Sequence, residues 1–574
     1  MHAGDKGKCI SLLYKISMKK ILLILFLLPI ATNAQTGWQW AKNIVSNGTS
    51  YGEAVTTDKF GDIYITGGCS DSVVTFDAIS LSNVNVYLAK YDTAGNVLWV
   101  KGATGSAFPT SVATDAEGNV YIAGAFQKPT LSFGSTILFN PDTVTSGEYI
   151  FLAKYDSSGD LIWAKSVGTF DNAINIAYSA TTDAAGNIYI AGEMGSGTLT
   201  FGATTLTRIG SSAYNVFLAK YAPSGNVIWA KNAGGTGGSG AEGTSVHVDA
   251  FGHLFLGGSF ETLNISFGTV TLTNTSSSGL NKNSFLVRYD TAGNAIWARS
   301  EESGNWSGTP WLITSDAADN IYFAGIYSLS AVTIGSTTLS YFGQTDIDIV
   351  KYDSSGVVIW AKGAGGTGGD APRGIACDAL GYIYVTGVYN SSSISFGTST
   401  ITNTGDNDMF FVKYDPCGNV VYATSLGSTA SDIGNSVWAN GSDIYLAGQF
   451  SHPSITFGTT VLTYSVTVPS YASDMLLSKW RLVANDSSCG LLRTQNIVAN
   501  GIGEINLWPN PARDKLTITA SNSITNVSIT NLIGQILYTH EYNDQQVQVN
   551  VAELPMGVYI IRMNGSEVRK FVKK

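Results

Sequence analysis

Short segments in which apolar residues dominate, or alternate with polar ones, recur along most of the chain, and turns rich in Gly, Asp and Asn separate them. One stretch reads SVATD at 111–115, VYIAG at 120–124, FLAKYD at 151–156 and LIWAK at 161–165. The turns AEGN and SSGD contain a Gly that suits the left-handed backbone of a tight hairpin. This pattern predicts four β-strands and no helix. Ile162 breaks the alternation of the last strand, which predicts that it is buried.

The same phrases return at a fixed interval. The Tyr of a Lys-Tyr pair recurs with spacings between 62 and 68 residues, and Trp480 stands in the seventh place: Tyr91, Tyr155, Tyr221, Tyr289, Tyr352, Tyr414 and Trp480. A further phrase, LTFGATTL at 199–206, has counterparts in other repeats and predicts an extra hairpin between the second and third strands. Four-stranded units at a fixed period indicate a β-propeller.

The count of strands predicts how the ring closes. The seventh repeat has three strands, and the N-terminal segment WQWAK at 38–42 reads as a fourth strand with no repeat of its own. If Trp40 lies beside the strand that holds Trp480, one strand from each end completes the last blade. We therefore expect an all-β fold, a seven-bladed propeller closed by an N-terminal strand, because closure hides the sheet edges.

The repeats carry a family resemblance. Units of the form D-x-x-G-N-I-Y-I-x-G followed by K-Y-D-x-x-G-N-V-x-W-A-K resemble the seven-bladed β-propeller repeat proteins of bacteria over residues 36–483. The resemblance implies the fold and an extracellular setting. It implies no shared reaction.

The N-terminal segment has the form of a secretory signal. MKKILLILFLLPIATNA at 18–34 combines two lysines, an apolar run and small residues, which predicts cleavage between Ala34 and Gln35. The apolar run is shorter than the ~20 residues of a membrane span, so an N-terminal anchor is the less favoured alternative. Residues 1–17 read as an upstream start-codon extension. We find no other stretch with the form of a transmembrane segment.

The C-terminal segment resembles a second family. The phrases LWPNPARDKLTI, VSITNLIGQIL and LPMGVYIIRM and the basic end are similar to the C-terminal sorting domain of type IX secretion, as found in Bacteroidetes-like bacteria. The residues that carry the resemblance are Pro509, Asn510, Pro511, Gly534, Gly557, Tyr559, Arg562, Lys573 and Lys574. It implies a small Ig-like β-sandwich at 504–574, after a linker at 484–503. It also implies the type IX secretion machinery as a partner and, after passage through the periplasm, a secreted or outer-surface destination.

Net charge and cysteine content limit the classes of partner and the disulfides that we expect. The formal net charge of −10 argues against a nucleic-acid partner. Five cysteines are too few for a disulfide scaffold, but an oxidising compartment favours a disulfide between Cys417 and Cys489. Cys69 and Cys377 lie in repeats that are not neighbours, which predicts that both remain thiols.

The sequence gives no set of catalytic or metal-binding residues. Each Asp-x-x-Gly turn offers one carboxylate, whereas a calcium loop needs several oxygens, so these Asp residues are interpreted as turn caps. The histidines of the repeats stand on separate units or strands, and no Ser-His-Asp set is evident from spacing. His247 is interpreted as a filler near the central channel. We therefore predict no metal and no cofactor.

Variable connections at one end of the propeller are the candidate binding site, because function tends to lie on loops over a rigid scaffold. Trp306, Trp311, Asp370 and Arg373 stand in these connections. They favour a non-catalytic module that binds a glycan or a protein, although both Trp would also suit packing under their own loop. We also expect the protein to be a monomer. The alternative is a secreted polysaccharide hydrolase or lyase that uses the channel mouth, which paired carboxylates would favour.

Overall fold

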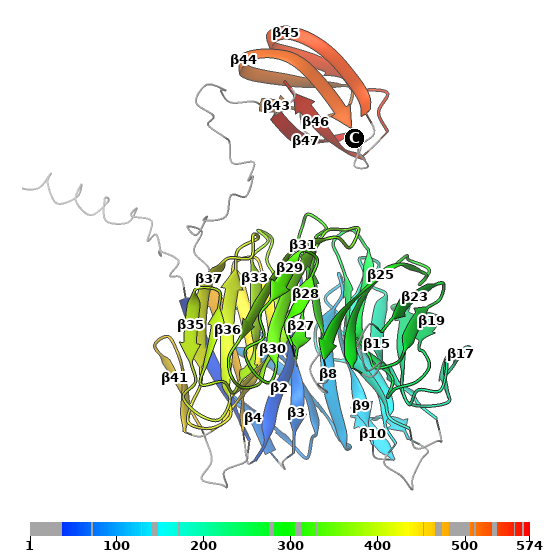
Figure 1. The fold of residues 1–574 in the computed structure, drawn as a ribbon, viewed down its shortest axis with the longest axis vertical. Helices are drawn as coiled ribbons and strands as arrows, with labels where there is room; N and C mark the ends of the chain where they lie inside the picture. Colours follow the sequence, from blue (N-terminus) through cyan, green and yellow to red (C-terminus); the bar gives the residue numbers. More distant parts are fainter. Residues whose placement is uncertain are drawn as a thin grey trace, which may run out of the picture. The chain divides into compact units, whose positions relative to one another are not determined.

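The computed structural model describes residues 37–573 apart from short gaps, and it divides the chain into two compact bodies, residues 1–489 and 490–574. The gaps are residues 47, 71–72, 128, 141–146, 170–172, 275–280, 305–310, 329, 452, 465–472, 482–505, 510–511, 531–535, 556 and 565–566. The described residues form β-strands and turns, as expected from the sequence (Figure 1). None of them belongs to a helix with the length and apolar character needed to cross a membrane.

The first body consists of four-stranded antiparallel groups, and in all but the last of them the four strands come from one sequence repeat. Seven such groups occur among the described residues, and we name them repeats 1 to 7. Repeat 1 has β2 (Ser50–Thr57), β3 (Ile63–Cys69), β6 (Val86–Tyr91) and β7 (Val97–Ala103); repeat 2 has β8 (Ala107–Thr114), β9 (Val120–Phe126), β12 (Tyr149–Tyr155) and β13 (Leu161–Val167); repeat 3 has β14 (Asn175–Thr182), β15 (Ile188–Met194), β18 (Asn215–Tyr221) and β19 (Val227–Ala233). Repeat 4 has β20 (Ala241–Val248), β21 (Leu254–Phe260), β24 (Lys282–Tyr289) and β25 (Ala295–Gly304); repeat 5 has β26 (Leu312–Ser315), β27 (Ile321–Tyr327), β30 (Asp346–Tyr352) and β31 (Val358–Gly365). Repeat 6 has β32 (Asp370–Cys377), β33 (Ile383–Tyr389), β36 (Asp408–Tyr414) and β37 (Val420–Leu426); repeat 7 has β38 (Ile433–Asn440), β39 (Asp443–Phe450), β42 (Asp474–Arg481) and β1 (Gly37–Ser46).

The fourth strand of repeat 7 comes from the other end of the chain. β1 pairs antiparallel with β42, and Trp38 lies opposite Trp480. The pairing of the two ends that the sequence predicts is therefore present. The β1 strand is longer than the predicted one and continues to Ser46.

Each repeat also contains the predicted hairpin, but the hairpin does not belong to its own sheet. The hairpins are β4 (Val73–Phe76) with β5 (Ile79–Ser82), β10 (Thr130–Phe133) with β11 (Thr136–Phe139), β16 (Thr198–Phe201) with β17 (Thr204–Thr207), β22 (Asn264–Phe267) with β23 (Val270–Thr273), β28 (Val332–Ile334) with β29 (Thr337–Leu339), β34 (Ser393–Phe396) with β35 (Ser399–Thr402), and β40 (Ser454–Phe457) with β41 (Thr460–Thr463). The β34 strand of repeat 6 pairs with β31 of repeat 5, and β4 of repeat 1 pairs with β1 of repeat 7. Each hairpin therefore lies between the fourth strand of its own repeat and the fourth strand of the preceding repeat.

Apolar layers hold neighbouring repeats together. One cluster of buried apolar side chains lies between each successive pair of repeats, and one more joins repeat 7 to repeat 1. The second and third strands are buried on both faces, so their residues do not alternate in polarity. The fourth strand is outermost. Ile162, which the sequence places in the core, is 50% exposed there, so this prediction is wrong.

The stereotyped Lys-Tyr-Asp-x-x-Gly phrase is explained by contacts between repeats. Trp163 of repeat 2 donates its Nε1 hydrogen to the carbonyl of Pro223 in the next repeat, and Lys154 donates to the same oxygen. Gly225, at φ +81°, lies under the indole, where an added Cβ would stand 3.0 Å from the ring. Between repeats 7 and 1 the same docking recurs, with Trp40 over Gly95. A turn of one repeat therefore rests on the Trp and Lys of the one before.

The C-terminal body is a separate five-stranded sheet with its own core. Its strands are β43 (Asn506–Trp508), β44 (Lys515–Thr530), β45 (Ile536–Asn550), β46 (Gly557–Met563) and β47 (Glu567–Lys573). The long β44 pairs with β43, β45 and β46, and β46 pairs with β47. Buried apolar residues on these strands form the core.

Candidate functional site

The first strands of all seven repeats line a central cavity of about 630 Å³. These strands contact one another in order around the cavity, and β38 of repeat 7 contacts β2 of repeat 1. Serines on these strands bind neighbouring backbones: Ser111 accepts a hydrogen bond from the Ala180 amide, and Ser436 accepts one from the Val55 amide. Hydrogen bonds between repeats thus hold the wall of the cavity in place.

A β-bulge breaks the register of six of these strands at the same position. A bulge re-aims the side chain of its extra residue. The six bulged residues all line the cavity, and they are Glu53, Thr110, Tyr178, Thr244, Arg373 and Asn435. We call this set the bulge ring. Trp311 holds the equivalent position in repeat 5, directly before β26.

The bulge ring is where the repeats differ from one another. Small residues flank most of its members, for example Gly52 and Ala54 around Glu53, or Ala177 and Ser179 around Tyr178. At the ring itself the side chains are acidic, basic, aromatic, hydroxyl and amide. A nearly symmetric scaffold therefore presents an asymmetric set of hydrogen-bonding groups to one cavity. Sequence reasoning missed this ring because a bulge is invisible in the apolar pattern, although the variation among otherwise similar segments was a usable signal.

Two ionisable members of the ring are perturbed by their surroundings. Burial raises the pKa of Glu53 to about 7, and the positive charge of Arg373 lowers it only in part. Burial also lowers the pKa of the Arg373 guanidinium. The carboxyl of Glu53 therefore titrates near neutral pH in a partly desolvated cavity, which is the condition expected of a functional group.

A second acidic group lies beside Tyr178 of the ring. Tyr178 is hydrogen-bonded to Glu193 on β15. Burial, together with the negative charge of Glu242, raises the pKa of Glu193 to about 7. Glu242 forms an ion pair with Lys282 and accepts a hydrogen bond from Ser259 Oγ at 3.0 Å. Two carboxylates, Glu53 and Glu242, therefore line the cavity, and Glu193 lies beside Tyr178 of its wall.

The residues predicted to bind ligand fall in different places. Arg373 lines the cavity as a member of the bulge ring. Trp311 is buried, 1% exposed, and packs above Gly325. Asp370 is fully buried, and its Oδ2 atom accepts hydrogen bonds from the Gly366 amide and Ser391 Oγ, both at 2.8 Å. Asp370 therefore organises its own loop, and Trp311 fills the core. Trp306 lies outside the described residues.

The Asp residues of the first turn are caps, as predicted. In repeat 2, Asp115 Oδ1 accepts hydrogen bonds from the amides of Glu117 and Asn119, and its Oδ2 accepts one from the Tyr121 hydroxyl at 3.0 Å. Lys154 approaches the same Oδ2 at 3.4 Å. Most other repeats have the same Asp-Tyr-Lys arrangement.

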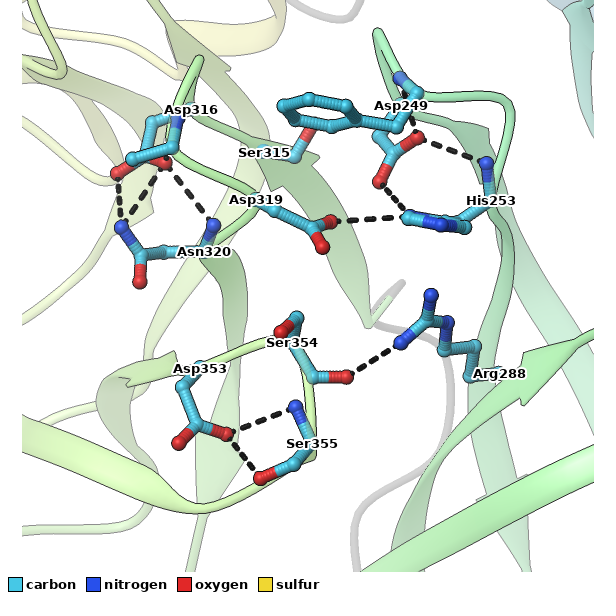
Figure 2. A network of polar contacts seen from close by, with 12 residues as sticks. Asp249, His253, Arg288, Ser315, Asp316, Asp319, Asn320, Asp353, Ser354 and Ser355 are labelled. Carbon is cyan, nitrogen blue, oxygen red and sulfur yellow. Dashed lines mark hydrogen bonds and ion pairs between the residues drawn. The ribbon is translucent and has the colours of Figure 1, made fainter. Parts of the chain in front are cut away.

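Repeat 4 departs from this arrangement, because Phe255 and Arg288 replace the Tyr and the Lys. Figure 2 shows His253 between two carboxylates, with Nδ1 at 2.9 Å from Asp249 Oδ2 and 3.1 Å from Asp319 Oδ1. Asp319, at φ +64°, stands where most repeats have Gly in this turn. Arg288 turns away and donates to the carbonyl of Ser354 at 2.7 Å.

Asp249, His253 and Asp319 could together hold a cation, since their ligand atoms lie within 4.8 Å of one another. Imidazole and carboxylate are ligands that Zn²⁺ accepts. The same contacts also replace the donors that Tyr and Lys provide in other repeats, so we interpret the cluster as a substitute for that network. Sequence spacing missed it because Asp319 belongs to the next repeat.

At the far end of the first strands, His247 also lines the cavity. Its Nε2 lies 2.8 Å from Ser315 Oγ of the next repeat. Burial lowers the pKa of His247 to about 4, so the imidazole is neutral at physiological pH. A neutral ring that bridges two strands agrees with the prediction that His247 fills space near the channel.

The C-terminal body contains part of the proposed sorting pattern. Tyr559 on β46 is 5% exposed, stacks on Phe571 with ring centroids 5.6 Å apart, and donates a hydrogen bond to the Pro555 carbonyl. Gly557 lies opposite Lys573 on β47. The remaining residues of the pattern are placed as follows: Pro509 directly follows β43, Arg562 is exposed on β46, and Asn510, Pro511, Gly534 and Lys574 lie outside the described residues. The cleavage residues Ala34 and Gln35 also lie outside them.

The structure describes three of the five cysteines. Cys417 is disulfide-bonded, whereas its predicted partner Cys489 lies outside the described residues. Cys69 and Cys377 are both thiols, and the Cys69 Sγ lies 3.0 Å from the Val84 carbonyl. The pairing of Cys417 with Cys489 stays a prediction.

Comparison with known proteins decides the nature of the C-terminal body. Residues 506–574 match the family described as secretion system C-terminal sorting domain. The C-terminal body is a sorting domain. This sorting domain marks a protein that type IX secretion exports to the cell surface or the medium, so the propeller-like body is its cargo.

The cargo has more distant relatives. It is similar to an uncharacterised WD repeat-containing protein of Acanthamoeba polyphaga mimivirus, 26% identical over 511 residues, which covers 73% of this chain and 36% of that protein. It is also similar to the regulatory protein FlaEY of Caulobacter vibrioides, 25% identical over 351 residues, with 56% and 34% of the two chains covered. The chain thus spans about a third of the length of these relatives.

Solved structures with some similarity include two bacterial proteins. One is PorZ, a surface component of the type IX secretion system of Porphyromonas gingivalis, with 10% identity, a TM-score of 0.19, and 93% of this chain and 100% of that chain covered. The other is a catalytically inactive virginiamycin B lyase from Staphylococcus aureus, with 10% identity, a TM-score of 0.35, and coverage of 77% and 99%. At these TM-scores neither carries an argument about activity.

Proposed function

We propose that this protein is an exported, closed seven-bladed β-propeller that binds a glycan or a protein segment in its central cavity. The observation that carries the proposal is the bulge ring, in which one position of the repeat holds five different kinds of side chain around a single cavity of about 630 Å³. Such asymmetry on a symmetric scaffold supports recognition rather than stability. The domain limits that go with this proposal are 36–483 for the propeller, 484–503 for the linker and 504–574 for the sorting domain.

The chemistry of the bulge ring suits a polar ligand. Arg373 and Asn435 supply hydrogen-bond donors, Glu53 supplies acceptors, and Tyr178 offers an aromatic face next to its hydroxyl. Sugars and extended peptides both present alternating donors and acceptors with apolar edges. Trp311 and Asp370 are expected to support the wall of the site rather than to contact the ligand, since both are buried.

A second candidate function is supported by the carboxylates. Glu53 and Glu193 both have pKa values raised to about 7, and Tyr178 lies beside Glu193. A carboxyl that titrates near the working pH is suited to general acid–base catalysis. This observation favours a polysaccharide hydrolase or lyase as the alternative to a binding module.

The test uses the secreted protein on a glycan and peptide array, followed by titration of each hit. Arg373→Ala should weaken binding about ten-fold or more, the contribution of one charge-assisted hydrogen bond. Arg208→Ala is the matched control, because Arg208 is exposed on the hairpin side of repeat 3. Equal affinity of Arg373→Ala and wild type for every hit would refute a site at the bulge ring.

The same hits separate binding from catalysis. Each bound glycan is incubated with wild-type protein and assayed for new reducing ends and for unsaturated products. An enzyme would give product that Glu53→Gln or Glu193→Gln abolishes while binding persists. A ligand that is recovered unchanged would support the binding module.

We also propose that Cys417 pairs with Cys489. Cys417 lies in the turn between the third and fourth strands of repeat 6, and the chain leaves repeat 7 after Arg481. Peptide mapping without reduction should recover the two cysteines in one cross-linked peptide. Recovery of Cys489 as an alkylated thiol would contradict the pairing.

A further inference from the structure

A second cavity lies away from the central one, between repeats 4 and 5. It has a volume of about 500 Å³. Its lining includes Arg299, Ser300, Glu301, Tyr327, Ser328 and Tyr352. These residues come from β25, β27 and β30, apart from Ser328, which directly follows β27, and none of them belongs to the bulge ring.

Glu301 occupies a position that is apolar in every other repeat. Four residues after the Trp or Tyr of the fourth strand, the other repeats have Ile44, Ala103, Val167, Ala233, Ala364 and Leu426, all of them buried. Glu301 therefore places a carboxylate where the fold otherwise requires a core side chain. The substitution is unfavourable for packing, since a buried carboxylate loses its hydration.

Asp348 makes the same kind of exchange on the adjoining strand. Four residues before the Tyr of the third strand, the other repeats have Tyr87, Phe151, Phe217, Phe285, Phe410 and Leu476, each fully buried. In repeat 5, Trp311 takes the place above Gly325 that the aromatic ring takes in other repeats. Trp311 therefore fills the space in the core that an aromatic residue at position 348 would fill, and the buried Asp348, 5% exposed, is not needed for that packing.

The two carboxylates interact with each other and lack a cationic partner among the described residues. The negative charge of Glu301 contributes to raising the pKa of Asp348, after burial. Tyr352 donates its hydroxyl hydrogen to Glu301 Oε1. The guanidinium of Arg299 donates instead to the carbonyls of Ala298, Ser355 and Gly356. Two acidic groups from adjacent repeats therefore interact, and neither forms an ion pair with a cationic side chain among the described residues.

Polar atoms of the cavity also remain unsatisfied. Glu301 Oε2 and Ser300 Oγ are buried without a hydrogen-bond partner. Buried polar atoms are normally paired, so each such atom indicates a missing partner. The rings of Tyr327 and Tyr352 border the same space. An acceptor with negative charge beside aromatic rings is the usual environment of an organic ammonium group.

We propose that the cavity between repeats 4 and 5 is a second binding site, which takes the primary ammonium group of an organic amine. Glu301 Oε2 accepts a hydrogen bond from the ammonium, Ser300 Oγ accepts a second, and Asp348 adds negative charge behind them. The volume exceeds that of a metal ion many times over and accommodates an alkylamine such as a lysine side chain or a diamine.

We expect the Glu301 carboxylate to lower the stability of the folded protein, and this effect can be measured separately from binding. Because Glu301→Ala restores the residue type of repeats 1, 3 and 5, it should fold and should raise the melting temperature. Asp348→Asn keeps the shape of the side chain and removes only its charge. A cost in stability at a site retained for binding is the expected trade-off. A lower melting temperature for Glu301→Ala would show that the carboxylate serves packing and would overturn the proposal.

Binding is tested by calorimetry on the secreted full chain with 1,5-diaminopentane. Burial raises the pKa of Glu301 to about 7, and the amine binds the ionised form. The affinity should therefore be about ten-fold higher near pH 8 than near pH 6. Glu301→Ala should abolish binding and Asp348→Asn should weaken it, whereas Glu117→Gln, at an exposed turn of repeat 2, should leave it unchanged.

Two further probes test whether the site recognises an ammonium group or another ligand. The neutral 1,5-pentanediol has the same length and should not bind, and binding of the diol as tightly as the diamine would refute recognition of an ammonium. Calcium chloride should not compete with the diamine, and competition would indicate a metal site instead. Absence of any heat with millimolar diamine in the wild-type protein would also overturn the proposal.

Discussion

Removal of the first part of β1, the strand that the N-terminal end adds to repeat 7, should destabilise the propeller measurably. Deletion of residues 36–42 takes away two indoles. Trp38 packs on Phe457 with ring centroids 4.8 Å apart, and Trp40 covers Gly95 of repeat 1. Both indoles are half-buried rather than fully buried.

The magnitude follows from this partial burial. Loss of a fully buried Trp costs about 3–5 kcal/mol, so two half-buried ones together cost about 4 kcal/mol. Trp480, which is 2% exposed in the intact sheet, would be uncovered as well. A protein of this length has a large entropy of unfolding, and the melting temperature should fall by roughly 4 °C.

The assay is thermal unfolding of the secreted protein followed by near-ultraviolet circular dichroism. Gln39→Ala is the matched control, because Gln39 lies on the same strand and is exposed. It should leave the melting temperature within a degree of the wild-type value, as surface substitutions usually do (about 0.5 kcal/mol or less). An unchanged melting temperature for the deletion would refute the contribution of this strand to repeat 7.

Three further predictions concern a turn, the sorting domain and pH. Gly418→Ala, at φ +78°, would place a Cβ 3.1 Å from the Trp360 ring, and it should lower the free energy of unfolding in chemical denaturation by about 3 kcal/mol. The control Gly134→Ala meets no atom within 4 Å and should cost about 1 kcal/mol. Equal costs for the two substitutions would contradict the docking of the turn. Removal of residues 505–574 should leave a folded propeller in the periplasm, which cell fractionation detects, and its arrival in the medium would contradict the sorting role. The pKa of Glu53 is raised to about 7 in the folded protein, so its contribution to the free energy of unfolding decreases as pH rises from its unfolded pKa through 7. In thermal unfolding, Glu53→Gln should therefore be more stable than wild type near pH 8 and no more stable than wild type near pH 4.

The repeated parts of the molecule could be predicted from the sequence because every copy of a phrase reflects the same packing or turn requirement. Four strands, a hairpin in each repeat and a strand shared between the ends all follow from phrases that recur in register. The Gly of the third turn recurs because Trp163 lies on Gly225 and its counterparts do the same in other repeats. The capping role of Asp115 also followed from its turn.

The candidate sites were less predictable because they depend on departures from the repeat. The strand alternation gives no indication of the bulge that turns Glu53 into the cavity. Trp311 reads as a loop aromatic, and only the structure relates its burial to Asp348, which stands in the place of an aromatic residue. Asp370 reads as a ligand, yet Asp and Asn at strand starts anchor their own loops. Burial of Ile162 failed as a prediction because its strand is outermost.

The docking of each repeat onto the one before has a direction. The Lys and Trp of one repeat dock on a turn of the following repeat, whereas its hairpin pairs with or packs against the preceding repeat, so the two faces of a repeat are different and complementary. Such an interface is heterologous: copies joined through it form a ring if the rotation closes and an open filament if it does not. A chain that lost one repeat would keep an unused donor face and an unused acceptor face. We expect copies of such a chain to join head to tail.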